Sequence, residues 1–342
     1  MFSLLNIVDA SNFTLDCNYS GGIRNKYESS FSYCILLTEL PKLSGNNYYS
    51  SFMYMFQCCT SLKRIPNNYL QNSSNLYDKC YSYMFNCCTG LTTLPSNLIQ
   101  ATTMAMYCCG HMFNGCTGLT TLPSNLLPTT TLESNCYDHM FNGCTGLTTL
   151  PSNLLPATTL ESNCYSYMFN GCTGLTTLPS NLLPATTLAS NCYSYMFNDC
   201  TGLTTLPSNL LPATKLASNC YDHMFNDCTG LTTLPALPAT TLARSCYYYM
   251  FGSCTSLVKT PDGWYLPAQT TYTYSCSSMF EGCSKLQKMA VAYSGTITSL
   301  HWQDWLYNVS RTGTLYYSKN QKKENIQSIV PSGWTLVQSL LW

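Results

Sequence analysis

The dipeptide Met-Phe recurs along this chain at a nearly constant interval, and this constrains the fold more than any other feature. Successive copies begin 29, 28, 28, 28, 28, 28, 26 and 29 residues apart in a chain of 342 residues. A period in this range predicts a solenoid, in which each unit buries its apolar face against its neighbours. A degenerate tenth copy has Ser30-Phe31 in place of Met-Phe. The copies start at Met55, Met84, Met112, Met140, Met168, Met196, Met224, Met250 and Met279.

Each unit contains two local patterns. Leu160, Cys164, Met168 and Cys172 are spaced by four residues, which predicts one stripe of a short helical turn over 160–172. Leu175 to Leu178 is a short β-capable run that Pro179 stops, and 179–187 is expected to be extended. The predicted fold class is therefore an α/β repeat solenoid with a short strand and a short helical turn in each coil of about 28 residues.

The repeat divides the chain into three segments. Residues 25–290 form the predicted solenoid of about ten coils. Residues 291–342 break the repeat and hold two β-capable runs, 312–317 and 334–337, with a charged run at 319–324 that is expected to be a loop. Solenoids need end caps, so 291–342 is interpreted as a small β-containing C-terminal capping or interaction segment. Residues 1–24 are either the N-terminal cap or a remnant of a longer protein.

The repeated motifs resemble a known family. The run Met-Phe-x-Gly-Cys-Thr-x-Leu-Thr-x-Leu-Pro is similar to the Ala-Phe-x-x-Cys-x-x-Leu-x-x-Ile pattern of BspA-type bacterial surface leucine-rich repeats. Cys-Tyr-x-Tyr-Met-Phe-x-x-Cys-Thr and Leu-Pro-Ala-Thr-Thr-Leu resemble a variant found in gut Bacteroidetes and their phages, and 305–315 and 329–337 resemble its C-terminal ending. The resemblance implies a leucine-rich-repeat solenoid used for surface recognition, and it implies no catalytic residue.

Cysteines follow the repeat. Of the 22 cysteines, 17 lie four residues before or after the Met position. The two positions are eight residues apart, about 12 Å on a helix, which is too far for a disulfide. Both columns are interpreted as small buried hydrophobes. Cys58 and Cys87 fall at a third, corner position, and this pair is the first candidate if any disulfide exists.

Histidines replace tyrosine before Met in three copies, at His111, His139 and His223. Asp138-His139 recurs as Asp222-His223, three coils later. A catalytic or metal-binding role is weighed against a simpler one, a partly exposed aromatic position, and the simpler one is preferred because a base needs a partner within hydrogen-bond reach. Cys or His clusters with metal-ligand spacing do not recur, and no catalytic motif is present. We therefore expect no catalytic residue, no metal, no cofactor and no enzymatic activity.

Tyrosines and threonines form the candidate ligand-binding columns. Tyrosine rings offer contact area at low entropic cost, although the same columns would also serve to hold the coils together. One threonine of each Thr-Thr pair should face outward from its strand; ice binding is conceivable for such a column, but simple solubilisation of the face is preferred. The candidate residues are Tyr83, Tyr165, Tyr167, Tyr193, Tyr195, Tyr247, Tyr249, Thr121, Thr149, Thr177 and Thr205.

Composition limits the partners. The net charge is zero and only 9% of the residues are charged, which argues against nucleic acid as a partner. No apolar run is long enough for a transmembrane helix, and the first residues lack the basic start of a secretory signal. We expect an extracellular, cell-surface or virion-surface protein that binds a surface polysaccharide or a protein. The alternative is a phage virion protein, tail-associated or decorating, for host recognition.

Overall fold

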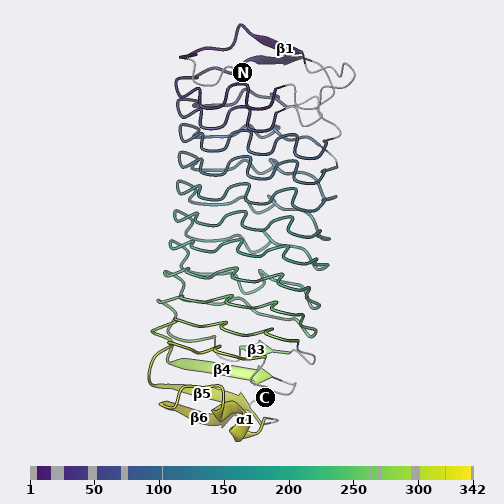
Figure 1. Cartoon of the computed structure of the whole chain (residues 1–342). Helices are drawn as coiled ribbons and strands as arrows, with labels where there is room; N and C mark the ends of the chain where they lie inside the picture. The colour runs from purple at the N-terminus through teal and green to yellow at the C-terminus, as the bar shows by residue number, and fades with distance from the viewer. Residues whose placement is uncertain are drawn as a thin grey trace. The chain divides into compact units, whose positions relative to one another are not determined.

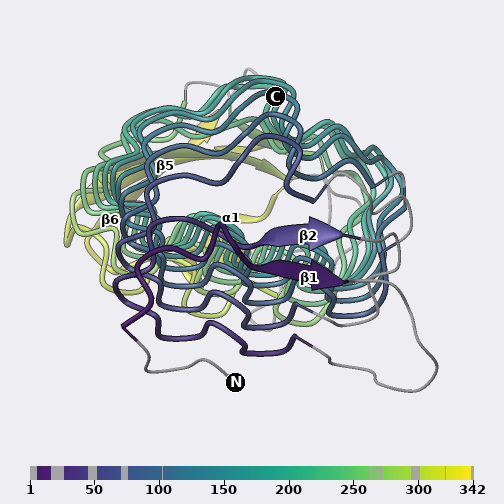
Figure 2. The same cartoon turned by 90° about the horizontal axis from the view of Figure 1, so that it is seen from above.

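The computed structural model describes residues 6–16, 27–44, 52–70, 76–101, 103–261, 264–267, 272–293, 301–319 and 321–339. The chain divides into two compact units, Met1–Leu175 and Thr176–Trp342. Within each unit the chain forms repeated coils that lie in register, one beside the next (Figure 1). Seen from above, the backbones of successive coils within each unit follow nearly the same path (Figure 2). The repeat thus folds as a solenoid-like stack within each unit.

Backbone hydrogen bonds join neighbouring coils at every second residue of the segment around Met. In unit 1, the amides of Tyr137, His139 and Phe141 donate to the carbonyl oxygens of Cys164, Ser166 and Met168, at 3.0, 2.9 and 2.9 Å. In unit 2, Tyr193 donates to Cys220 at 3.1 Å, with the same offset of 27 residues. The coils are therefore held together by direct backbone pairing as well as by side-chain packing.

The same segment contains no α-helix, so the predicted helical turn is wrong. Between the residues that pair across coils, Cys136, Asp138 and Met140 donate to the carbonyl three residues earlier, at 3.2–3.3 Å. Every fourth residue is left-handed: Asn135 has φ 59° and His139 has φ 55°. This is a succession of β-turns, alternate ones with a positive φ at the third residue. We call it the turn segment, residues 133–144 in this coil.

The chain forms a turn segment and not a helix because of the hydrogen-bond partners of its backbone amides. An α-helix directs every amide to the residue four earlier within the same segment. Here half of the amides bond to the neighbouring coil instead, so an isolated coil could not satisfy them. The period of four residues that predicted a helix is the period of this alternation of turns.

The predicted strand at 175–178 is also largely absent. Among the described residues of this stretch only Thr177 forms a β-bridge, a parallel one with Thr205. Proline ends the extended run, and Pro179 to Leu182 closes as a turn through a hydrogen bond of 3.2 Å from the Leu182 amide, where an extended stretch was expected. A short strand and a helical turn in each coil are therefore not the units of this fold.

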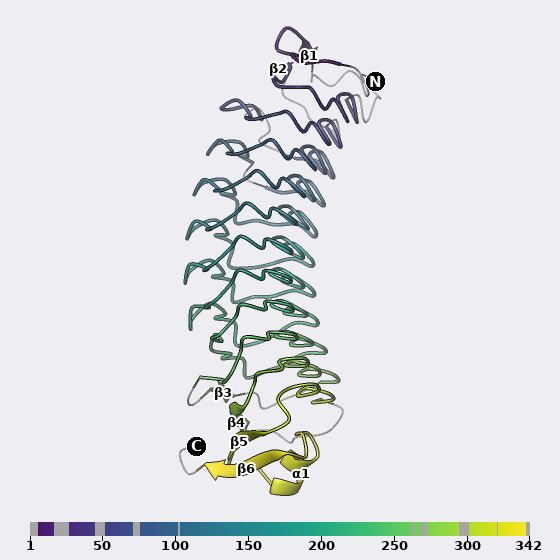
Figure 3. The same cartoon turned by 90° about the vertical axis from the view of Figure 1, so that its left-hand side faces the viewer.

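Regular strands occur in the described residues only near the two ends of the chain. β1 (Thr14–Asp16) pairs in parallel with β2 (Lys42–Ser44) in unit 1. In unit 2 a parallel sheet has the order β3 (Tyr265–Leu266), β4 (Lys288–Tyr293), β5 (Gly313–Ser318) and β6 (Trp334–Ser339), as Figure 3 shows. α1 (Lys323–Gln327) connects β5 to β6.

The C-terminal strands were predicted well and the segment between them less well. β5 and β6 cover the β-capable runs 312–317 and 334–337. Lys323 and Glu324 lie in α1, not in a loop. The proposed boundary at residue 290 falls inside β4, which pairs with both β3 and β5. The boundary at residue 24 lies outside the described residues.

The core of each coil consists of the repeated Met, Phe, Cys and Leu residues, as predicted. Met140, Phe141, Cys144 and Leu147 are all fully buried. The phenylalanines form parallel stacks; Phe113 and Phe141 have ring centroids 5.6 Å apart. Full burial of such a side chain is worth about 1.5–3 kcal/mol, repeated in every coil.

Buried cysteines after Met also make hydrogen bonds, which an alkyl side chain could not. The Sγ atoms of Cys144, Cys172 and Cys228 lie 3.2 Å from the carbonyl oxygens of Phe113, Phe141 and Phe197 in the preceding coil. Cysteine thus fills a small space and adds a second hydrogen bond to a buried carbonyl that already accepts one from a backbone amide. All cysteines that the structure describes are free thiols, and Cys17 lies outside the described residues. Cys58 and Cys87 are hydrogen-bonded neighbours.

No helix among the described residues is long and apolar enough to cross a membrane.

Candidate functional site: a half-exposed column of stacked rings

From Tyr54 to Tyr249, the residue before each repeated Met carries an aromatic ring that is neither fully buried nor fully exposed. We call these rings the outer ring column. Each ring lies nearly parallel to the next: Tyr83 and His111 are 4.2 Å apart by their centroids, His111 and His139 4.4 Å, and His139 and Tyr167 4.3 Å. The described column consists of Tyr54, Tyr83, His111, His139 and Tyr167 in unit 1 and Tyr195, His223 and Tyr249 in unit 2.

The turn segment fixes this column. The outer rings are carried by the left-handed residues; His111, Tyr167 and His223 have φ of 56°, 54° and 51°. The amide of each described ring residue from Tyr83 to His139 donates to the adjacent coil, at 2.8–3.0 Å. A left-handed residue is costly for a ring-bearing side chain, and the repeated hydrogen bonds hold it in place. Each ring is therefore positioned by backbone, at the spacing of the coils.

Two residues earlier in each coil lies a second column, which is buried. We call Tyr137 and Tyr165 in unit 1, with Tyr193, Tyr221 and Tyr247 in unit 2, the inner tyrosine column. Their rings stack at 5.8–5.9 Å, and Tyr165, Tyr193 and Tyr247 are each only 1% exposed. A ligand cannot reach rings that are covered in this way. Tyr165, Tyr193 and Tyr247 are therefore removed from the candidate ligand-binding residues, whereas Tyr83, Tyr167, Tyr195 and Tyr249 keep an accessible edge.

The threonine column differs from its prediction. Both members of each Thr-Thr pair are exposed: Thr121, Thr149, Thr177 and Thr205 face solvent, and so do the threonines that precede them. Because no continuous strand forms here, the alternation of faces that a strand imposes does not apply. Some of these hydroxyls form hydrogen bonds with the backbone; Thr232 Oγ1 donates to the carbonyl oxygen of Thr204 at 2.8 Å.

Carboxylates lie beside the histidines of the outer ring column in both units. In unit 1, Asp138 Oδ1 lies 2.9 Å from His139 Nδ1, and Asp138 Oδ2 lies 3.8 Å from His111 Nε2. In unit 2, Asp222 Oδ1 lies 2.6 Å from His223 Nδ1. The side chains of His111, Asp138 and His139 are 20, 15 and 26% exposed, so the group is sheltered but accessible.

The environment of His111 keeps its ring neutral. Burial and then the neighbouring His139 lower the pKa of His111, with Asp138 opposing the change, and the resulting pKa is about 4. Burial is the largest cause because the ring is sandwiched between Tyr83 and His139. A neutral imidazole has a lone pair, so it can accept a proton or bind a metal ion.

This group was not predicted from the sequence, in which each aspartate was paired with the histidine beside it and the two pairs lie three coils apart. The usable signal was the interval of 28 residues between His111 and His139, which puts two imidazoles in adjacent coils. When the coils are aligned by that interval, Asp138 lies beside the rings of both His111 and His139.

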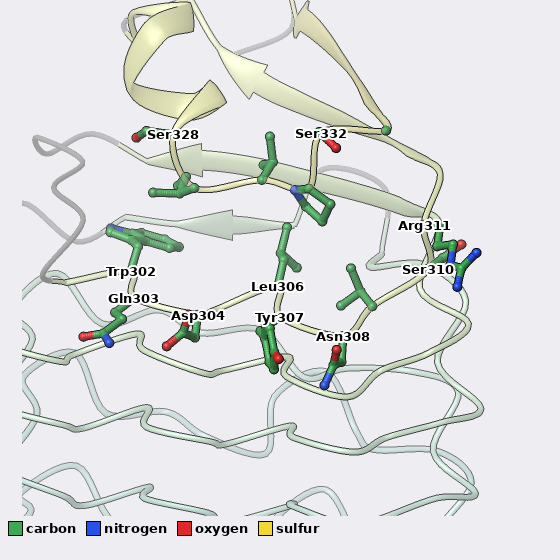
Figure 4. Close-up of a pocket in the computed structure, with 15 residues that line it drawn as sticks. Trp302, Gln303, Asp304, Leu306, Tyr307, Asn308, Ser310, Arg311, Ser328 and Ser332 are labelled. Atoms are coloured by element: carbon green, nitrogen blue, oxygen red, sulfur yellow. The ribbon is translucent and has the colours of Figure 1, made fainter.

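A separate cavity lies within the C-terminal part of unit 2 (Figure 4). It has a volume of about 700 Å³ and is lined by 302–304, 306–311 and 328–333. Figure 4 shows Trp302 and Arg311 at opposite ends, with Leu306 and Tyr307 between them. The indole nitrogen of Trp334 donates to the carbonyl of Ser310 at 2.8 Å, which ties β6 to one wall. A segment with the same alternation of turns lines this cavity: Asp304 and Asn308 are among the lining residues and are left-handed like the outer ring residues.

Comparison with known proteins finds no family model that matches the chain and no curated protein that matches it. The resemblance to BspA-type repeats stays a prediction.

Proposed function

We propose that this protein is a non-enzymatic recognition or adhesion protein, and that the outer ring column is its contact surface for a surface polysaccharide. The observation that carries the proposal is the continuity of the column: five rings of unit 1, from Tyr54 to Tyr167, stack without a gap and stay half-exposed. Contiguous exposed aromatic residues are typical of binding surfaces.

The stacking decides which part of each ring a ligand meets. The faces of His111 and His139 are occupied by the neighbouring rings, so solvent reaches ring edges, hydroxyl groups and imidazole nitrogens. Such edges donate and accept hydrogen bonds and do not offer flat platforms. An extended, hydroxyl-rich polymer fits a row of this kind, because it can make many weak contacts in parallel.

Charge supports the same class of ligand. The chain has no net charge, and its charged residues are few. Recognition through uncharged hydrogen-bonding groups gives no electrostatic advantage to a polyanion or polycation. A neutral glycan on a cell or virion surface is the ligand class proposed, within a leucine-rich-repeat-like architecture of the BspA type.

A glycan array with the full chain tests the proposal. Tyr83→Ala and Tyr167→Ala should each weaken binding about fivefold or more, because the loss of one anchor from a contact surface costs over about 1 kcal/mol. Tyr165→Phe is the matched control two residues away, and it should leave binding unchanged. Binding that survives both alanine substitutions, in variants that still fold, would contradict the proposal. If the chain bound proteins and no glycan, the proposed ligand class would be wrong and a protein would take its place.

A further inference from the structure

Three potential metal ligands from two adjacent coils converge on the outer ring column of unit 1. His111 comes from one coil, and Asp138 and His139 from the next. One ligand atom from each residue can be chosen so that all three lie within 4.8 Å of one another. Among the described residues this is the one group of its kind.

The distances suit a small borderline metal ion. In a tetrahedral site with bonds of 2.0–2.1 Å, ligand atoms are about 3.3 Å apart. The two carboxylate oxygens of Asp138 make contacts on either side of that value: Oδ1 lies 2.9 Å from His139 Nδ1, and Oδ2 lies 3.8 Å from His111 Nε2. Two imidazoles and a carboxylate are the donor set that Zn²⁺ and its neighbours prefer over Mg²⁺ or Ca²⁺. We propose that His111, Asp138 and His139 form a site for a divalent transition metal of the Zn²⁺ class, with water completing the coordination.

Binding requires a small rearrangement of the rings. The two imidazoles lie nearly parallel, with an angle of 16° between their planes, whereas a metal ion must lie close to the plane of each ring it binds. Rotation about χ2 corrects this, and χ2 of histidine is a broad torsion without sharp minima.

The second unit provides a natural comparison. Tyr195, Asp222 and His223 occupy the corresponding positions, and Tyr195 and His223 stack at 4.4 Å. The group therefore differs from the first by one residue, a phenol in place of an imidazole. A phenol with a pKa near 10 remains protonated at neutral pH and is a poor ligand. The site is consequently assigned to unit 1 alone.

The proposal can be tested by loss and by gain. With the full chain and no glycan present, titration with Co²⁺ followed by absorption, and with Zn²⁺ followed by calorimetry, should give one site with nitrogen and oxygen ligands. His111→Tyr copies the second unit into the first and should lower the affinity at least tenfold, as loss of even an outer-shell partner costs 10–100-fold. Tyr195→His copies the first unit into the second and should add a second site.

Thiols are the competing ligands, and the experiment separates them. The double variant Cys58→Gly/Cys87→Gly removes the half-exposed pair of thiols. Glycine is chosen because it occupies the same repeat position in later coils, at Gly115 and Gly143. Metal binding should persist in this background without a sulfur-to-cobalt charge-transfer band. Absence of binding, a sulfur band, or equal affinity in His111→Tyr would each overturn the proposal. None of these results depends on glycan recognition, which is measured in the presence of a chelator.

Discussion

Tyr165 and Tyr167 are two residues apart in the same turn segment, yet their environments are opposite. Tyr165 belongs to the inner tyrosine column and is 1% exposed, whereas Tyr167 belongs to the outer ring column and keeps an accessible edge. The backbone separates them: Tyr167 is left-handed with φ 54°, and Tyr165 is not among the left-handed residues. Left-handed positions every four residues therefore sort identical side chains into a core column and a surface column.

Alkaline pH should have the largest effect, and it acts on the inner side. Burial raises the pKa of Cys172, Cys192 and Cys246 from 9.0 to about 12. Above about pH 9 the unfolded chain loses these protons and the folded chain keeps them, so stability falls by about 1.4 kcal/mol per pH unit for each such thiol. The urea midpoint should drop steeply between about pH 9 and pH 12. A midpoint that stays constant through about pH 10 would contradict the buried thiol columns.

Truncation of the two tyrosines should separate the columns next. Tyr165→Ala empties a fully buried ring position and should cost about 3–5 kcal/mol. Tyr167→Ala removes a partly exposed ring that stacks on His139, and such a stacking contact is worth about 0.5–1.5 kcal/mol. Urea unfolding of both variants measures the difference, and equal losses would show that the two columns are not distinct environments.

A smaller change should stabilise the inner column. The hydroxyl of Tyr137 is buried without a hydrogen-bond partner among the described residues. Tyr137→Phe removes an uncompensated polar atom and should raise stability by about 1 kcal/mol. The stability of Tyr221→Phe, the variant at the corresponding position of unit 2, is measured beside it for comparison. A loss of stability in Tyr137→Phe would mean that the hydroxyl is hydrogen-bonded in solution.

The outer side should respond least, through backbone strain. Asp199 is exposed and left-handed, with φ 57°, at the position that Gly143 and Gly171 occupy in earlier coils. Asp199→Gly removes the strain of a left-handed side chain but adds freedom to the unfolded chain, so a gain of a few tenths to about 1 kcal/mol is expected. Thermal unfolding measures it, and destabilisation would argue against strain at this position.

The repeat was fully readable from the sequence, but its local geometry was not. Leu160, Cys164, Met168 and Cys172 are spaced by four residues, and over three steps this spacing is close to the 3.6-residue period of a helix. The distinction depends on hydrogen bonds between coils, which a single unit does not reveal. Asn135 and Gly143, eight residues apart, are of types that tolerate φ > 0 and lie at two of the left-handed positions, and this was the available signal.

The candidate site was predictable in part for the same reason. Burial of the repeated Met, Phe and Cys follows from apolarity, and it was predicted correctly. Which tyrosine of each pair faces solvent depends on the turn geometry, so Tyr165 and Tyr167 could not be distinguished in advance. The grouping of His111 with Asp138 and His139 needs the register between coils, which the repeat interval contains but a search for local motifs overlooks.

Nitration of the native protein, mapped by tandem mass spectrometry, tests this sorting most directly. The reagent should modify Tyr167 and Tyr195 and leave Tyr165 and Tyr193 unmodified, because the inner rings are covered on all sides. In denaturant all four should react alike, which controls for intrinsic reactivity. Equal modification of Tyr165 and Tyr167 in the folded protein would contradict the division into a buried and an accessible column.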